Sequence, residues 1–136
     1  MNFLLDTNVV SDAMNARPNR KVVTWLGSQD FERLLISVLT IGEIRRGIEQ
    51  MNVGQRQNNL RQWIDNDLLQ KKRNQILPVT LAVAERWGQL SAAAKRTLPQ
   101  IDTLIAATAI HHNLILVTRN TRDFQFPGLE IFDPFG

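Results

Sequence analysis

Apolar residues along the chain occur in short runs and in longer stripes of helical spacing, and the two kinds of segment alternate. The short runs predict β-strands at residues 3–5, 34–36, 76–77, 114–117 and 131–132. Strands that are joined by helices form a largely parallel sheet with helices on both faces. The pattern therefore predicts an α/β fold of four to five strands, in which each connecting helix starts at the carboxyl edge of the sheet.

The clearest helix follows the second strand, where the apolar positions are three, four and three residues apart: Ile41, Ile44, Ile48 and Met51. Two further amphipathic helices are predicted at residues 60–68 and 83–94. Residues 103–110 are apolar almost all round, which indicates a central helix that is buried against the sheet. We expect loops at residues 16–20 and 52–59, and a helix end at residues 71–73.

Four acidic residues fall at positions that this topology sends to one edge of the sheet. Asp6 follows the first strand, Glu43 lies early in the next helix, Asp102 begins the buried helix and Asp123 follows the fourth strand. Carboxylates that converge repel one another unless a cation neutralises them, and carboxylate oxygens are ligands for hard divalent ions. The four acids therefore form a candidate site for Mg²⁺ or Mn²⁺.

Each of these acids also has an ordinary structural interpretation. Asp6 can cap a helix that begins at Thr7, and Asp102 can cap one that begins at Thr103. The four residues 40–43 match a capping box, and Asp123 suits a turn. Only the joint placement of the four acids favours the metal site over four separate caps and turns.

Composition narrows the chemistry. The chain has 136 residues, which suits a single domain over residues 1–136, and it contains no cysteine, so thiolate metal sites and thiol nucleophiles are excluded. The two histidines, His111 and His112, are adjacent and so point to different faces of a helix, which is wrong for a metal pair. No apolar run approaches the roughly 20 residues that cross a bilayer, and no secretory signal is evident, so we expect no membrane association and a cytoplasmic location.

Three segments of the sequence resemble the signature blocks of PIN-domain nucleases, and more narrowly the VapC and FitB toxins of type II toxin–antitoxin pairs. They are "LLDTNVVS" at 4–11, "ISVLTIGEIRRGI" at 36–48 and "IDTLIAATAIHHNLILVTRNTRDF" at 101–124. The resemblance implies a PIN-like three-layer sandwich and an endoribonuclease that uses Mg²⁺ or Mn²⁺. It also implies an RNA substrate, with transfer RNA among the candidates, a homodimer, and a cognate DNA-binding antitoxin of the VapB or FitA kind.

The resemblance also carries site residues. Asp6, Glu43 and Asp102 match the three acids of the family, whereas the fourth ligand is Asp123, Asn120 through its amide oxygen, or a water held by either residue. Small polar residues match positions that line the site in the family, and two arginines flank it as candidates for holding the substrate: Thr7, Asn8, Ser37, Thr118, Arg119 and Arg122.

The net charge of +3 is compatible with a polyanionic partner but does not require one. Basic residues elsewhere are candidates for phosphate contacts, although most of them suit solvated helix faces: Arg17, Arg20, Lys21, Arg45, Arg46, Lys71, Lys72, Arg73, Lys95 and Arg96. Among the tryptophans, Trp63 and Trp87 stand at core spacing and are interpreted as structural, and Trp25 is a candidate for base stacking.

Two other functions remain open from the sequence. A non-catalytic interaction module would use the acids as caps and would bind a partner through its basic surface or through the apolar stripes at residues 22–26 and 41–51. A DNA-directed nuclease on the same fold is equally compatible, because no residue pattern here reads a 2′-hydroxyl group.

Overall fold

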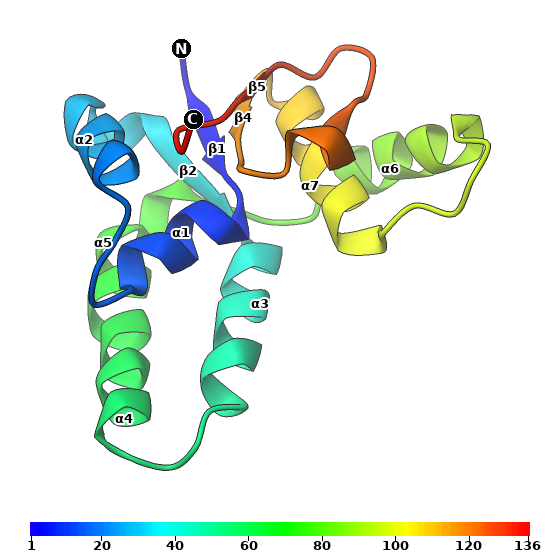
Figure 1. The fold of residues 1–136 in the computed structure, drawn as a ribbon. Coiled ribbons are helices and arrows are strands. Elements are labelled where there is room, and N and C mark those ends of the chain that lie inside the picture. Colours follow the sequence, from blue (N-terminus) through cyan, green and yellow to red (C-terminus); the bar gives the residue numbers. More distant parts are fainter.

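The computed structural model describes residues 1–136 and contains one five-stranded sheet (Figure 1). The strand order is β3-β2-β1-β4-β5, and every neighbouring pair is parallel. The strands are β1 (Phe3–Leu5), β2 (Leu34–Ser37), β3 (Ile76–Leu77), β4 (Ile115–Val117) and β5 (Ile131–Phe132). All five predicted strands are confirmed, and three of them have the predicted bounds.

The helices include the four that the periodicity predicts, with differences at their ends. They are α1 (Thr7–Met14), α2 (Arg20–Ser28), α3 (Val38–Glu49), α4 (Gln55–Gln62), the π-helical η2 (Trp63–Leu68), α5 (Leu69–Lys71), α6 (Leu81–Ala93) and α7 (Gln100–His111). Short 3₁₀ turns lie at η1 (Phe31–Arg33), η3 (Arg73–Gln75) and η4 (Thr121–Phe124). None of these helices is long and apolar enough to cross a membrane.

The alternation of side chains along β1 separates two hydrophobic clusters, one on each face of the sheet. Leu5 joins a cluster with residues of α1, α2, α3, α4 and η2, whereas Leu4 joins a cluster with residues of α7 and β4. Figure 1 shows α1 to α5 on one side of the strands, and α7 with α6 on the other. The expected sandwich of a sheet between two helical layers is confirmed.

The prediction of a loop over residues 52–59 is wrong in its second half, because α4 already begins at Gln55. The hydrophobic periodicity does not reveal this helix, because one of its buried residues is polar. The side chain of Gln57 is only 2% exposed, and its Nε2 donates to the backbone oxygens of Ile48 at 2.9 Å and Met51 at 3.2 Å. An amide that satisfies the carbonyls at the end of α3 takes the place that an apolar side chain would fill.

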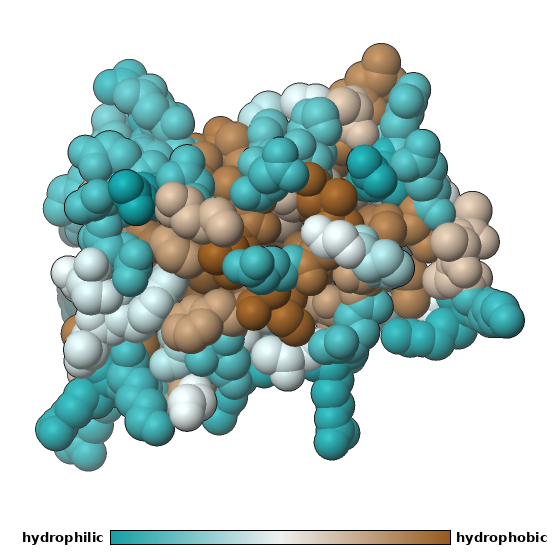
Figure 2. All heavy atoms as spheres, turned by 90° about the horizontal axis from the view of Figure 1, so that it is seen from above, coloured by the Kyte–Doolittle hydropathy of each residue, from teal (hydrophilic) through white to brown (hydrophobic).

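The two ends of the sheet differ in character. Figure 2 views the molecule from the edge where the strands begin, and apolar side chains gather in the middle of that face inside a hydrophilic rim. At the opposite edge, α1 follows β1 and α3 follows β2 without an intervening loop, because Asp6 and Ser37 cap these helices directly. Polar side chains at the strand ends are thereby drawn together at the carboxyl edge.

Candidate active site

Asp6 lies at the end of the central strand and is only 4% exposed. Its Oδ1 accepts a hydrogen bond from the backbone N–H of Thr7 at 2.8 Å, so the residue caps α1 as one interpretation of the sequence predicts. Its Oδ2 accepts from the hydroxyl of Thr118 at 2.8 Å and from Nδ2 of Asn8 at 3.3 Å. The carboxylate is therefore both a cap and a member of a polar network that joins β1 to the end of β4.

Thr118 is the centre of that network and is fully buried. Its hydroxyl donates to Asp6 and accepts from the backbone N–H of Asn120 at 3.0 Å and from Nδ2 of Asn8 at 3.3 Å. The Oδ1 of Asn8 in turn accepts from the backbone N–H of Arg119 at 3.2 Å. Five residues that the sequence assigns to the site are thus joined by hydrogen bonds, although Arg119 and Asn120 take part through their main chains.

Glu43 is connected to Asp6 through the next residue, Thr7. The hydroxyl of Thr7 donates to Oε1 of Glu43 at 2.5 Å, a short distance that is typical of a hydroxyl bonded to a carboxylate. The same hydroxyl lies 3.4 Å from that of Thr40, which is fully buried. Thr40 belongs to this group and was missed by sequence reasoning, although a threonine within an apolar helical stripe is a signal for a polar contact in the interior.

The capping-box interpretation of residues 40–43 is wrong. Helix α3 begins at Val38, and its cap is Ser37, whose hydroxyl accepts from the backbone N–H of Leu39 at 3.0 Å. Glu43 therefore lies one turn inside the helix and has no capping contact, so its carboxylate is available for the site. Ser37, expected to line the site, is buried with its hydroxyl engaged in the cap.

Asp102 is not a helix cap either, because α7 begins at Gln100. Burial first, and then the negative charges of Asp6, Glu43 and Asp123, together raise the pKa of its carboxyl to about 6. Burial also raises the pKa of Asp6, and the charge of Glu43 adds to that effect against the hydrogen bonds from Thr118 and Thr7. Four carboxyl groups from distant parts of the chain are thus within electrostatic range of one another.

The donor set suits a hard divalent cation. It consists of carboxylate oxygens with threonine hydroxyls and asparagine amides behind them, without sulfur or imidazole, and the repulsion that raises the pKa of Asp102 is the repulsion that a cation would relieve. No three acidic or histidine side chains are gathered closely enough to hold an ion as they stand. The chemistry of the residues fits such an ion, which would draw the carboxylates in.

The two candidates for the fourth acidic position are placed differently. Asp123 lies in η4 with its side chain exposed, and its charge acts on Asp102. Asn120 precedes η4 and is tied to Thr118 through its backbone N–H. Only Asp123 has an electrostatic influence on the other acids.

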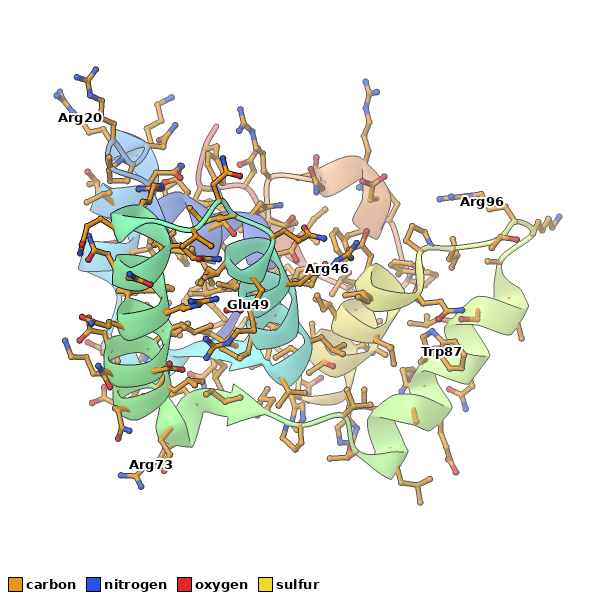
Figure 3. The ribbon with its side chains drawn as sticks, turned by 90° about the horizontal axis from the view of Figure 1, so that it is seen from below. Arg20, Arg46, Glu49, Arg73, Trp87 and Arg96 are labelled. Atoms are coloured by element: carbon orange, nitrogen blue, oxygen red, sulfur yellow. The ribbon has the colours of Figure 1, made fainter.

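Three arginines belong to segments at this edge, which Figure 3 views from below. The guanidinium of Arg119 lies 4.9 Å from the ring centre of Phe135, and Arg122 is exposed on η4. Arg46 lies between α3 and α7 (Figure 3). By contrast, Arg45 is paired with Asp65 across the α3–η2 contact.

The prediction that Lys72 lies on a solvated helix face, as a candidate for phosphate contact, is wrong. It is 6% exposed, and its Nζ donates to the backbone oxygens of Leu34 at 2.7 Å and Phe31 at 3.2 Å, with the ring of Phe31 at 3.8 Å. Burial lowers the pKa of this amine to about 8. Lys72 therefore stabilises the start of β2, and its buried amine is not accessible to a phosphate.

The aromatic and histidine side chains behave largely as structural elements. Trp25 packs edge-on against Phe3 at 5.0 Å between ring centres and against Phe132 at 5.2 Å. The rings of His111 and His112 lie 4.7 Å apart at the end of α7, away from the sheet edge, as the sequence predicts. Neither histidine takes part in the network around Asp6.

Comparison with known proteins gives consistent relatives. The PIN domain model matches residues 3–127. The chain is 33% identical over 136 residues to "VapC ribonuclease Y4jK" of Sinorhizobium fredii, which covers 98% of this chain and 97% of the relative. It is 34% identical over 136 residues to "Toxin FitB" of Neisseria gonorrhoeae, with 98% of each chain covered.

Solved structures agree with the sequence relatives. The crystal structure of FitAcB from Neisseria gonorrhoeae superposes with a TM-score of 0.91 at 34% identity and covers 98% of each chain. The structure of FitAB bound to a DNA fragment superposes with a TM-score of 0.90 at 31% identity, over 98% of this chain and 96% of that one. The three signature segments, the sheet order and these relatives together show that the chain belongs to the PIN-domain family, within the group of VapC and FitB toxins.

Proposed function

We propose that this chain is the toxin of a type II toxin–antitoxin pair and a divalent-metal-dependent endoribonuclease. The observation that carries the proposal is the polar network at the carboxyl edge of the sheet, where Thr118 bonds to Asp6 and Thr7 bonds to Glu43, next to Asp102 with its raised pKa. Relatives that are named as a VapC ribonuclease and a toxin support the same activity. Hydrolysis of RNA phosphodiester bonds is the reaction that joins the site to these names.

Asp6, Glu43, Asp102 and Asp123 would hold Mg²⁺ or Mn²⁺. When it is bound there, such an ion supplies Lewis-acid activation of water and neutralises charge that develops on the phosphate. Thr118 fixes one oxygen of Asp6, and the hydroxyl of Thr7 fixes one oxygen of Glu43. These hydrogen bonds hold two of the carboxylates in place before the ion binds. Less conformational entropy is therefore lost on binding.

The remaining residues would act on the substrate. The exposed cations Arg119, Arg122 and Arg46 border the acids and would contact phosphates on either side of the scissile bond. Asn8 and Asn120 line the path between Arg119 and Asp6, where their amides would orient a phosphate oxygen or a water. No histidine is needed as a base if the nucleophile is activated by the ion.

The partners follow from the same relatives. Similar solved structures are toxin–antitoxin complexes, among them FitAcB and a VapBC complex bound to DNA from Salmonella typhimurium. We therefore infer a cognate DNA-binding antitoxin of the VapB or FitA kind, a homodimeric toxin and action in the cytoplasm. The whole of residues 1–136 acts as one domain in this proposal.

The activity is tested with purified protein on single-stranded RNA, transfer RNA and DNA, with Mg²⁺, with Mn²⁺ and with a chelator. We expect cleavage of RNA that requires the ion. The Asp102→Asn variant should lose at least about 100-fold in rate, because changes in the residues behind metal ligands alone cost roughly 10–100-fold. The matched control is Asp67→Asn, an exposed acid on η2, which should cleave at the parent rate.

A second measurement follows the ion without activity. Millimolar Mn²⁺ should raise the melting temperature of the parent and of Asp67→Asn, since an ion that binds only the folded chain stabilises it. It should raise the melting temperature of Asp102→Asn much less. Equal rates of RNA cleavage by the parent and Asp102→Asn would refute the proposal, as would cleavage of DNA alone.

A further inference from the structure

A hollow of about 570 Å³ lies directly beside the acids, on the far side of η4. It is bounded by the end of α6, the α6–α7 connection and the segment after η4, and Asp123 is one of its lining residues. Asp123 is one of the four candidate acids and also lines the hollow, so the hollow borders the acidic site at this residue. Its volume is within the range of about 300–1000 Å³ that small-molecule sites occupy.

The walls of the hollow combine apolar surface with positive charge. Leu90, Leu98 and Phe126 line it, and both Leu90 and Phe126 pack against the buried cluster under α7, so this surface is fixed in place. Lys95 and Arg96 stand on the α6–α7 connection, are exposed and have no ion-pair partner. Figure 3 shows Arg96 at this connection, on the same side of the molecule as η4.

Apolar surface bordered by unpaired cations has the chemistry that binds a nucleotide. The face of an unstacked base packs on aromatic and aliphatic side chains, while lysine and arginine bind the neighbouring phosphates. The position next to the acids matches this chemistry, because the base beside a scissile phosphate must lie within one nucleotide of the reacting bond. Unpaired cations in the hollow and a polyanionic substrate are complementary in charge.

A polar side chain in the hollow can also meet the edge of a base. Gln125 has its Nε2 bonded to the backbone oxygen of Thr121 at 2.8 Å, and its amide keeps one N–H donor and its Oε1 acceptor for a further partner. Because an amide that both donates and accepts can bond any of the four bases, this contact does not depend on the base. We propose that this hollow binds the base of the nucleotide adjacent to the cleaved bond in single-stranded RNA, with Lys95 and Arg96 on the neighbouring phosphate.

This inference rests on the proposed function, and its test separates the two. The cleavage site is first mapped on RNA, and short oligonucleotides then carry an abasic nucleotide on one side of the cut or on the other. We expect removal of the base at one of these positions to lower kcat/KM of the parent about tenfold, as the loss of one stacked base does. The Leu98→Asn variant, which removes apolar surface from the hollow, should reduce this loss to within about threefold.

The cations are tested with Arg96→Gln and Lys95→Gln against the control Arg73→Gln. Arg73 is exposed and lies at the opposite end of the molecule in Figure 3. Each of the first two variants should raise KM about fivefold with kcat within about twofold, and should reduce the salt slope of RNA binding by about one. Binding is followed with fluorescein-labelled RNA and a chelator, so that this readout does not depend on catalysis.

The outcomes are distinct. A parent that cleaves no RNA overturns both the function and the subsite. A parent that cleaves abasic and complete oligonucleotides equally fast, whichever side of the cut is abasic, overturns the subsite alone, as does Arg96→Gln behaving as Arg73→Gln does. Variants that change inhibition by the antitoxin but leave RNA binding and cleavage intact would show that the hollow receives a peptide, which also overturns the proposal.

Discussion

The hydroxyl of Thr118 stabilises the charged form of a buried carboxylate, and the substitution Thr118→Val removes that hydroxyl at nearly constant volume. The bond to Oδ2 of Asp6 is 2.8 Å long and fully buried, and it lowers the pKa of a group that burial raises. Hydrogen bonds to charged groups contribute about 1.5–3 kcal/mol. The backbone N–H of Asn120 also loses its acceptor. We expect a loss of about 2–4 kcal/mol in the free energy of unfolding at pH 8, with a chelator present.

The loss should depend on pH with a defined sign. In the variant the pKa of Asp6 in the folded chain lies further above its value in the unfolded chain. Loss of the hydrogen bond therefore destabilises the folded chain only at pH values where Asp6 is ionised. The difference between parent and variant is therefore largest well above the raised pKa and decreases as pH falls through it. Urea denaturation at half-unit steps between pH 8 and 5 measures this decrease.

Thr108→Val provides the matched control. Thr108 is equally buried, and its hydroxyl donates to the backbone oxygen of Leu104 at 2.8 Å within α7, so no charge is involved. This variant should lose at most about 1 kcal/mol, independently of pH. Equal losses in the two variants, or a loss for Thr118→Val that does not change between pH 8 and 5, would show that Thr118 does not stabilise the ionised Asp6.

Three further predictions concern stability. The pKa of Lys72 is about 8 in the folded chain and higher in the unfolded chain, so unfolding takes up a proton above pH 8 and the free energy of unfolding rises with pH. In urea titrations, Lys72→Met should remove a rise of about 2 kcal/mol between pH 8 and 9.5. An unchanged rise would contradict the burial of Lys72. Asn19→Ala should cost about 1 kcal/mol by thermal denaturation, because Asn19 Oδ1 accepts two backbone N–H groups at the start of α2; no loss would contradict the cap. Ser37→Ala should cost a similar amount with KM for RNA unchanged, whereas a raised KM with unchanged stability would return Ser37 to the site.

The parts of the fold that the sequence predicts are those in which apolar side chains decide the structure. The strands are short apolar runs, and α7 is recognised because six of its residues are buried. The prediction fails at α4 and at Lys72, where the nitrogen of a buried polar side chain donates to backbone carbonyls. Such positions look solvated in a sequence, because the partners that make their burial tolerable come from distant elements.

The candidate site divides in the same way. Topology alone brings Asp6, Glu43, Asp102 and Asp123 to one edge, since it depends only on strand order and strand ends. Capping is a local property, yet it was assigned to the wrong residues on α3 and α7, because the exact first residue of each helix is set by how the preceding strand ends.

The first strand of the chain lies in the middle of the sheet, and its last neighbour comes from residues 115–117. The backbone N–H of Asp6 even donates to the oxygen of Val117 at 2.9 Å. During synthesis on the ribosome, β1 therefore cannot pair with β4 until the final quarter of the chain has emerged. A nascent chain thus cannot assemble its acidic centre early, and translation itself delays the moment at which the finished molecule can attack RNA.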